Sequence, residues 1–149
     1  MAKRHYIPIT SDVPGVSDSK CAFIRKVIRT ALAAEGVDFP CEIDVELTDD
    51  DDELMLATRQ GQAIRFKETD IRSMGRNSMG VKSFDLAEND EVISVARIEA
   101  GKQVLAITQN GYGKRTDVSE FRVQSRGGKG IMAMTTKEED YAERMVVVS

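Results

Sequence analysis

The last two thirds of the chain contain an internal repeat with a spacing of fifty residues. Residues 56–61 (Leu-Ala-Thr-Arg-Gln-Gly) align without a gap with residues 106–111 (Ala-Ile-Thr-Gln-Asn-Gly). A repeat of this length is typical of blades or solenoid units, each too small to bury its apolar face alone. Residues 1–50 have no copy, so they are treated separately. The alignment pairs further residues: Arg65 with Arg115, Asp70 with Glu120, Arg76 with Arg126, and Gly80-Val81 with Gly130-Ile131.

The repeated part has a pattern of short strands separated by glycine turns. Arg59-Gln-Gly61 and Gln109-Asn-Gly111 are predicted hairpin turns, because glycine adopts the positive φ that such turns require. Phe66 and Tyr112 are expected in the core or on a strand face. We therefore predict a mainly antiparallel, blade-like β portion over residues 51–149. The segments with strand composition are 54–58, 63–66, 91–96, 104–108 and 145–148.

Residues 1–50 are predicted to form a β-α-β unit. The first strand is Tyr6–Thr10. Apolar residues then recur at helical spacing between Ser17, a suitable N-cap, and Gly36, a suitable C-terminal cap. Residues 41–47 alternate apolar and acidic side chains, as a half-exposed strand does. The predicted fold class is α+β, with this unit joined to the β portion.

Basic residues recur at equivalent places in the two repeats, although the net charge of the chain is −4. They cluster in residues 59–82 and again in residues 112–130. Two interpretations stay open: a solvated polar edge, or a repeated stripe that contacts phosphates. The acidic run of residues 49–53 is expected to be a solvated turn, because it lacks the spacing of a calcium-binding loop.

The composition favours a cytoplasmic protein. No apolar run approaches ~18 residues, and the N-terminus has no apolar segment of the kind that signal peptides carry. The two cysteines, Cys21 and Cys41, have no motif spacing, so free thiols are expected rather than a disulfide or a metal site.

Residues 52–149 resemble the C-terminal domain family of the DNA gyrase A protein. The resemblance is carried by residues 63–68, 74–81 and 108–116, and by Gln124-Ser-Arg-Gly-Gly-Lys-Gly130. This last segment is similar to the seven-residue box of the family, from which it departs at Ser125, where the family usually has a basic residue. The resemblance implies about two blades of a six-bladed β-pinwheel that wraps DNA around its basic rim.

The box and the basic clusters give a set of candidate contacts to the DNA backbone. Gly127-Gly128 would let the main chain approach a phosphate closely, with Arg126 and Lys129 supplying charge on either side. Alternatively, the box glycines form a tight bulge within a blade. The candidate DNA-binding residues are Arg65, Lys67, Arg72, Arg76, Lys114, Arg115, Arg122, Gln124, Arg126, Gly127, Gly128, Lys129 and Gly130.

Residues 1–50 resemble the start of the YbeY family of metal-dependent endoribonucleases. The resemblance rests on His5-Tyr-Ile-Pro-Ile, on Ala33-Ala-Glu-Gly-Val-Asp and on Leu47-Thr-Asp-Asp50. The zinc site of that family needs three histidines, whereas His5 is the single histidine of this chain. No metal site and no cofactor are therefore expected. The two resemblances together suggest a mosaic of unrelated genes, of recombinant, designed or generated origin.

The sequence as a whole indicates a non-enzymatic module that binds duplex DNA weakly and without sequence preference. Gyrase catalysis is not expected, because no tyrosine of this chain matches the nucleophile of that enzyme. The alternative is a structural or interaction protein without a DNA role, which associates with itself through open strand edges. A residual ribonuclease is the least favoured interpretation, on histidine count.

Overall fold

The computed structural model describes residues 26, 48, 51–72 and 81–149. Lys26 is helical and lies within the helix predicted for the first fifty residues. The rest of the predicted β-α-β unit lies outside the described residues, apart from Thr48. Arg76 lies outside them as well.

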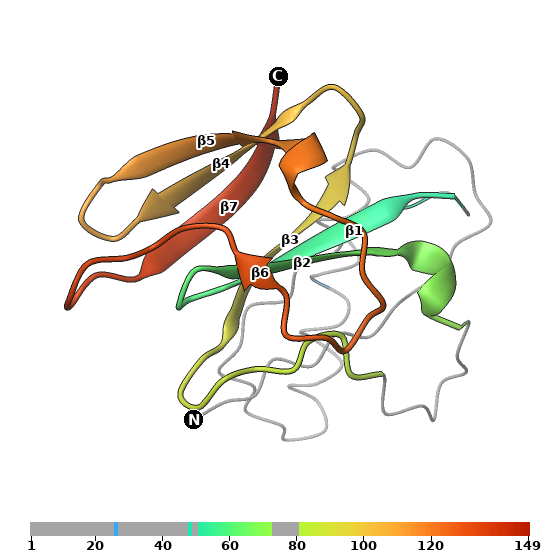
Figure 1. The fold of residues 1–149 in the computed structure, drawn as a ribbon, viewed down its shortest axis with the longest axis horizontal. Helices are drawn as coiled ribbons and strands as arrows, with labels where there is room; N and C mark the ends of the chain where they lie inside the picture. The colour runs from blue at the N-terminus through green and yellow to red at the C-terminus, as the bar shows by residue number, and fades with distance from the viewer. Residues whose placement is uncertain (1–25, 27–47, 49–50, 73–80) are drawn as a thin grey trace.

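The described part consists of two equivalent units, each built on a β-hairpin that runs into a 3₁₀ turn (Figure 1). Unit one has β1 (Glu53–Thr58), β2 (Gln62–Lys67), η1 (Glu68–Asp70) and β3 (Val92–Ile98). Unit two has β4 (Gln103–Thr108), β5 (Gly113–Asp117), η2 (Val118–Glu120), β6 (Ile131–Met132) and β7 (Ala142–Val148). The fifty-residue spacing of the sequence is therefore the spacing between equivalent elements.

The strands form two antiparallel sheets, and one of them draws on both units. The first sheet has the order β3-β1-β2-β6, and the second has the order β5-β4-β7. β6 comes from unit two but pairs with β2 of unit one, where Ala63 lies opposite Ile131. A parallel bridge between Arg65 and Val123 joins the same two units. This architecture confirms the predicted mainly antiparallel, blade-like portion.

Each hairpin turn is fixed in the same way in the two units. Gly61 and Gly111 have φ values of +88° and +84°, which only glycine adopts readily. The hydroxyl Oγ1 of Thr58 accepts the N–H of Gln62 at 3.2 Å, and Thr108 accepts that of Tyr112 at the same distance. Both threonine side chains are buried, so these bonds satisfy hydroxyls that water does not reach.

Two apolar clusters form the core, one on each face of the first sheet. Alternate residues of β1 point to opposite faces, so Leu54 and Leu56 lie in one cluster and Met55 and Ala57 in the other. The first cluster belongs to unit one alone: Leu54, Leu56, Ile64, Phe66, Phe84 and Val92. The second is shared: Met55, Ala57, Ala63 and Ile98 of unit one pack with Val104, Ala106, Val118, Phe121, Ala133, Met134, Ala142 and Met145 of unit two.

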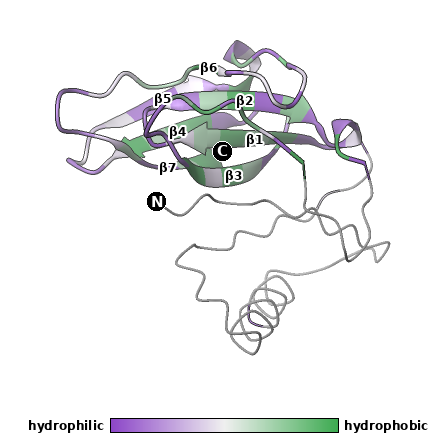
Figure 2. Cartoon of the chain, turned by 90° about the horizontal axis from the view of Figure 1, so that it is seen from below, coloured by the Kyte–Doolittle hydropathy of each residue, from purple (hydrophilic) through white to green (hydrophobic). Residues whose placement is uncertain are grey.

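The hydropathy of the strands follows this arrangement (Figure 2). Apolar residues concentrate on strands such as β1 and β3, whereas the turns are more hydrophilic. Phe66 is fully buried, which confirms its predicted place in the core. The same prediction was wrong for Tyr112, which is 53% exposed because it lies in the β4–β5 turn.

Candidate nucleic-acid interface

The box lies in a loop of unit two that runs along unit one. We call residues 122–130 the box loop; it connects η2 to β6. At its start, the N–H of Gln124 donates to the carbonyl of Arg65 on β2 at 2.7 Å. At its end, Gly130 leads into β6, which pairs with the same strand. The loop is therefore anchored to β2 at both ends.

Arg126 binds the loop to unit one through its guanidinium group. Nε donates to the carbonyl of Asp70 at 2.8 Å, and Nη1 donates to the carbonyl of Lys82 at 2.8 Å. Asp70 ends η1, and Lys82 is the second residue of the described segment that follows residues 73–80. Arg126 thus joins two parts of unit one that are distant along the chain.

The box glycines serve the close approach of the two units. The N–H of Gly127 donates to Ser83 O at 2.8 Å, and the carbonyl of Gly128 accepts the N–H of Asp85 at 2.8 Å. A Cβ on Gly130 would lie 2.5 Å from the carbonyl oxygen of Ala63 and 2.8 Å from the ring of Phe84. These contacts favour packing between units as the role of the glycines, since the Gly127 N–H is already used within the protein.

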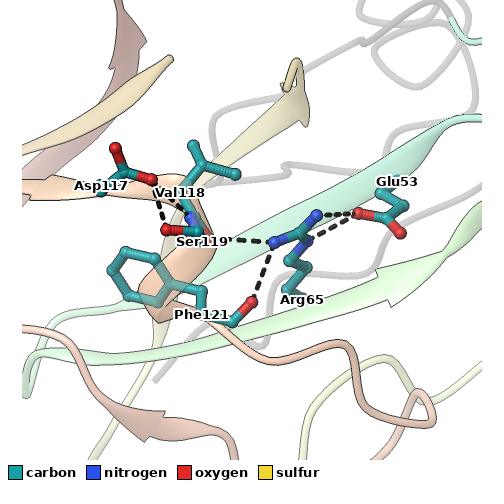
Figure 3. Close-up of polar contacts among 6 residues, drawn as sticks. All are labelled: Glu53, Arg65, Asp117, Val118, Ser119 and Phe121. Carbon is teal, nitrogen blue, oxygen red and sulfur yellow. Dashed lines mark hydrogen bonds and ion pairs between the residues drawn. The ribbon is translucent and has the colours of Figure 1, made fainter. Parts of the chain in front are cut away.

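Arg65 is held inside the unit interface (Figure 3). Its Nε donates to Oε2 of Glu53 at 2.6 Å, and its Nη2 forms an ion pair with the same carboxylate oxygen. Its Nη1 donates to the carbonyls of Val118 and Phe121, each at 2.9 Å. The side chain is only 17% exposed, which leaves little of it for an external ligand.

The turn η2 that Arg65 contacts has its own cap. Oδ1 of Asp117 accepts the hydroxyl of Ser119 at 2.6 Å and the backbone N–H of Ser119 at 2.8 Å. The hydroxyl bond and then the backbone bond lower the pKa of Asp117, because they stabilise the ionised carboxylate. The η2 turn is therefore fixed both from within and by Arg65.

Five cations with exposed side chains lie in the box loop or in the segments of unit one that flank its contacts with Arg126. Lys67 and Arg72 flank η1, whose last carbonyl binds Arg126. Lys82 pairs with Asp85 at 2.5 Å. The hydrogen bond and charge of Lys82, with a smaller contribution from the charge of Lys129, lower the pKa of Asp85. The exposed cations are Lys67, Arg72, Lys82, Arg122 and Lys129.

Lys114 and Arg115 lie apart from this group, on β5 of unit two. Figure 1 places β5 at the upper left and η1, beside the box loop, at the right. The Nζ of Lys114 donates to the carbonyl of Ala133 at 3.3 Å, and Arg115 donates to the carbonyl of Ser149. The structure therefore divides the candidate residues into a box group and a β5 group.

Sequence reasoning missed Lys82 as a site residue. It belongs to the basic stretch of residues 59–82, but its place beside the box loop follows from the bond between its carbonyl and Arg126. The side chain of Gln124 differs from those of the exposed cations, because its Nε2 is buried and has no hydrogen-bond partner in the described structure.

Other kinds of site find no support in the described residues. No group of three or more His, Cys, Asp or Glu side chains among them could hold a metal ion. Within the same residues, no helix is both long and apolar enough to cross a membrane.

Comparisons with known proteins agree with the two-unit architecture. A family model for the DNA gyrase C-terminal domain, a β-propeller, matches residues 52–99 and again residues 102–149. The DNA gyrase A protein of Haloquadratum walsbyi is 45% identical over 100 residues, which cover 66% of this chain and 12% of that protein. That of Escherichia coli is 41% identical over 115 residues, covering 76% and 13% respectively. The chain thus spans only 12–13% of the length of these relatives.

Solved structures show the same likeness. The C-terminal domain of DNA topoisomerase IV matches with a TM-score of 0.67 and 29% identity, over 71% of this chain and 34% of that one. The DNA gyrase A C-terminal domain matches with a TM-score of 0.58 and 27% identity, over 67% and 32%. These findings confirm the resemblance predicted for residues 52–149. Because the family model covers both repeats, the chain belongs to the DNA gyrase C-terminal domain family of β-propellers.

Proposed function

We propose that residues 51–149 form a non-enzymatic module that binds the backbone of duplex DNA weakly and without sequence preference. The observation that carries this proposal is the group of five exposed cations in the box loop and in the segments of unit one next to it. Hydrogen bonds to unit one hold the loop in place, so the backbone that carries these cations has a fixed position. Membership of the gyrase C-terminal domain family supports DNA as the ligand.

The contacts in this proposal are made by side chains. Lys67, Arg72, Lys82, Arg122 and Lys129 would each neutralise a phosphate and release a counterion. Arg126, Gln124 and the box glycines hold the loop in place. Phosphate contacts carry no sequence information, so no base preference is expected. Because the net charge is −4, affinity depends on these few local contacts.

A charge-matched pair of variants tests the proposal. The Arg122→Ala/Lys129→Ala variant should weaken binding to a random-sequence duplex by about tenfold at low salt, because two phosphate contacts are lost. Lys102→Ala/Arg144→Ala is the control, because it also removes two positive charges: Lys102 lies in the β3–β4 turn and pairs with Glu99, and Arg144 is exposed on β7. Fluorescence anisotropy measures both. Equal affinities of the double variant and the wild type would contradict the proposal.

Self-association is a second candidate, favoured by the outer edge of β5. No strand of the described residues pairs with this edge, whereas the equivalent edge of β2 is covered by β6. Four of the five β5 residues are exposed. Lys114 and Arg115 on this strand oppose edge-to-edge pairing, as edge lysines often do. Light scattering over a range of concentrations tests this candidate; a constant monomer mass would remove it.

We also propose that residues 1–50 carry no ribonuclease chemistry and that the chain is a mosaic. The support is the single histidine of the sequence and the two distinct resemblances. Metal-dependent cleavage of RNA by the purified chain would contradict the first statement. An intact copy of this reading frame in a genome would contradict the second.

A further inference from the structure

Arg65 connects three parts of the molecule through a single guanidinium group. Glu53 lies on the neighbouring strand β1, diagonally across from Arg65 on the same face of the sheet. The other two partners are the carbonyls of Val118 and Phe121, which bracket η2 in unit two (Figure 3). The backbone carbonyl of Arg65 accepts the N–H of Gln124. Side chain and backbone of one residue therefore bind the chain on both sides of Arg122.

The equivalent arginine of unit two lacks this arrangement. Arg115 occupies the same repeat position, but Gln103 stands where Glu53 stands in unit one. Arg115 is exposed and reaches the carbonyl of Ser149. The repeat alone does not decide the role of these arginines, because the carboxylate partner and the adjoining unit are present only at Arg65.

We propose that Arg65 is a positioning residue for the box loop and does not itself contact DNA. This inference rests on the proposed function, since it assigns a role in forming the same DNA-contacting surface. Arg65 fixes the carbonyls of Val118 and Phe121 and so sets where the chain leaves η2. Arg122 and the box loop then follow in the position that their cations need. Glu53 orients the guanidinium fork toward these carbonyls.

Neutralising Glu53 changes the DNA affinity in opposite directions depending on whether Arg65 positions the loop or contacts DNA directly. Neutralising an acidic residue near a DNA-binding surface normally strengthens binding, because repulsion of the phosphates is removed. If Glu53 orients Arg65, Glu53→Gln instead weakens binding by about three- to tenfold, because the charged hydrogen bond that holds the guanidinium group is replaced by a weaker neutral one.

Arg65→Lys gives a second, independent test. Lysine keeps the positive charge but lacks the planar fork that serves a carboxylate and two carbonyls at once. A phosphate contact would survive this change almost unaltered. Positioning predicts a loss of about threefold or more in affinity with an unchanged salt dependence, since no phosphate-contacting cation is removed.

The experiment compares five proteins by fluorescence anisotropy on the same duplex. They are the wild type, Glu53→Gln, Arg65→Lys and two controls on β7, Glu143→Gln and Arg144→Lys, whose side chains are exposed. We expect weaker binding only for the first two variants. Thermal unfolding followed by circular dichroism verifies folding, and Glu53→Gln carries the test if Arg65→Lys does not fold. Stronger binding by Glu53→Gln would overturn the inference.

Amide hydrogen exchange provides a readout that does not depend on DNA. Positioning predicts faster exchange at Gln124 and Gly127 in Glu53→Gln and Arg65→Lys, with unchanged exchange at Leu105 in β4. Uniformly faster exchange would show general destabilisation and overturn the inference. If the wild type does not bind DNA, the proposed function fails, and faster local exchange then still shows that Arg65 holds the loop.

Discussion

Gly61 and Gly111 occupy the same position in the two units but meet different surroundings. Their φ values are nearly equal, at +88° and +84°. A Cβ on Gly61 would lie 2.0 Å from the carbonyl oxygen of Met134 in unit two, whereas a Cβ on Gly111 has nothing within 4 Å. A difference in stability between substitutions at Gly61 and Gly111 therefore reports how tightly unit two packs against the turn that contains Gly61.

Alanine at these two glycines separates backbone strain from steric overlap. Gly111→Ala should cost about 1 kcal/mol in unfolding free energy, because alanine tolerates positive φ poorly. Gly61→Ala should cost about 3 kcal/mol or more, because the overlap with a backbone carbonyl is added to the same strain. Urea denaturation measures both changes. Equal losses would show that the Met134 carbonyl does not constrain the turn.

The same residue scale explains why the site could be predicted only in part. The sequence pairs Arg65 with Arg115, and both became candidate phosphate contacts because equivalent positions suggest equivalent roles. The contacts of Arg65 depend on η2 of the other unit, which the local sequence does not show. In contrast, Arg122 and Lys129 were predicted from local charge and are exposed.

At the scale of elements, each unit has one aspartate that joins its hairpin turn to the start of its last strand. This aspartate is Asp90 in unit one and Asp140 in unit two. Oδ1 of Asp140 accepts the N–H of Asn110 at 3.2 Å and that of Tyr141 at 2.9 Å. Asp90 binds Gln60 and Glu91 in the same way, each at 2.9 Å. A residue with positive φ precedes each aspartate, so each turn depends on this side chain for its shape.

Asp140→Ala should lower the midpoint of thermal unfolding, because the backbone N–H groups of Asn110 and Tyr141 lose their acceptor. Asp140→Asn keeps an oxygen acceptor in the same position, so it should keep most of the stability that Asp140→Ala loses. Thermal unfolding compares the two variants with the wild type. An asparagine variant as unstable as the alanine variant would show that geometry alone does not maintain the turn.

The strands that were predicted from the sequence are those that contain apolar residues. β1, β2, β3, β4 and β7 were each located within a few residues, since their side chains enter the core. β5 was not predicted, because Gly-Lys-Arg-Thr-Asp lacks an apolar face and lies exposed at a sheet edge. β6 has two residues and forms only through its pairing with β2, a contact across some seventy residues of sequence that no local pattern reveals.

At the scale of the whole molecule, the two units share one of the two apolar clusters of the core. Met55 and Ala57 of unit one lie in the same cluster as Met145 and Val104 of unit two. β6 also completes the sheet of unit one. The repeat predicted units that bury apolar surface against each other, and the shared cluster agrees with this prediction. It did not show that the box loop is the segment that joins them.

This sharing predicts that the two units unfold together. Met145→Ala should lower the unfolding free energy by about 2–4 kcal/mol, because it leaves a cavity in the shared cluster. Hydrogen exchange should then speed up in β1 of unit one as well as in β4 of unit two. Faster exchange confined to β4 and β7 would show instead that unit one is stable independently.

The central claim is that the exposed cations in and next to the box loop bind the DNA backbone. The most direct test is the salt dependence of duplex binding by the wild-type chain. With five exposed cations in and next to the loop, log Kobs should fall linearly with log salt with a slope of roughly −3 to −4.5, equally for unrelated sequences. Absence of binding at about 50 mM salt, or an affinity that does not change with salt, would contradict the account.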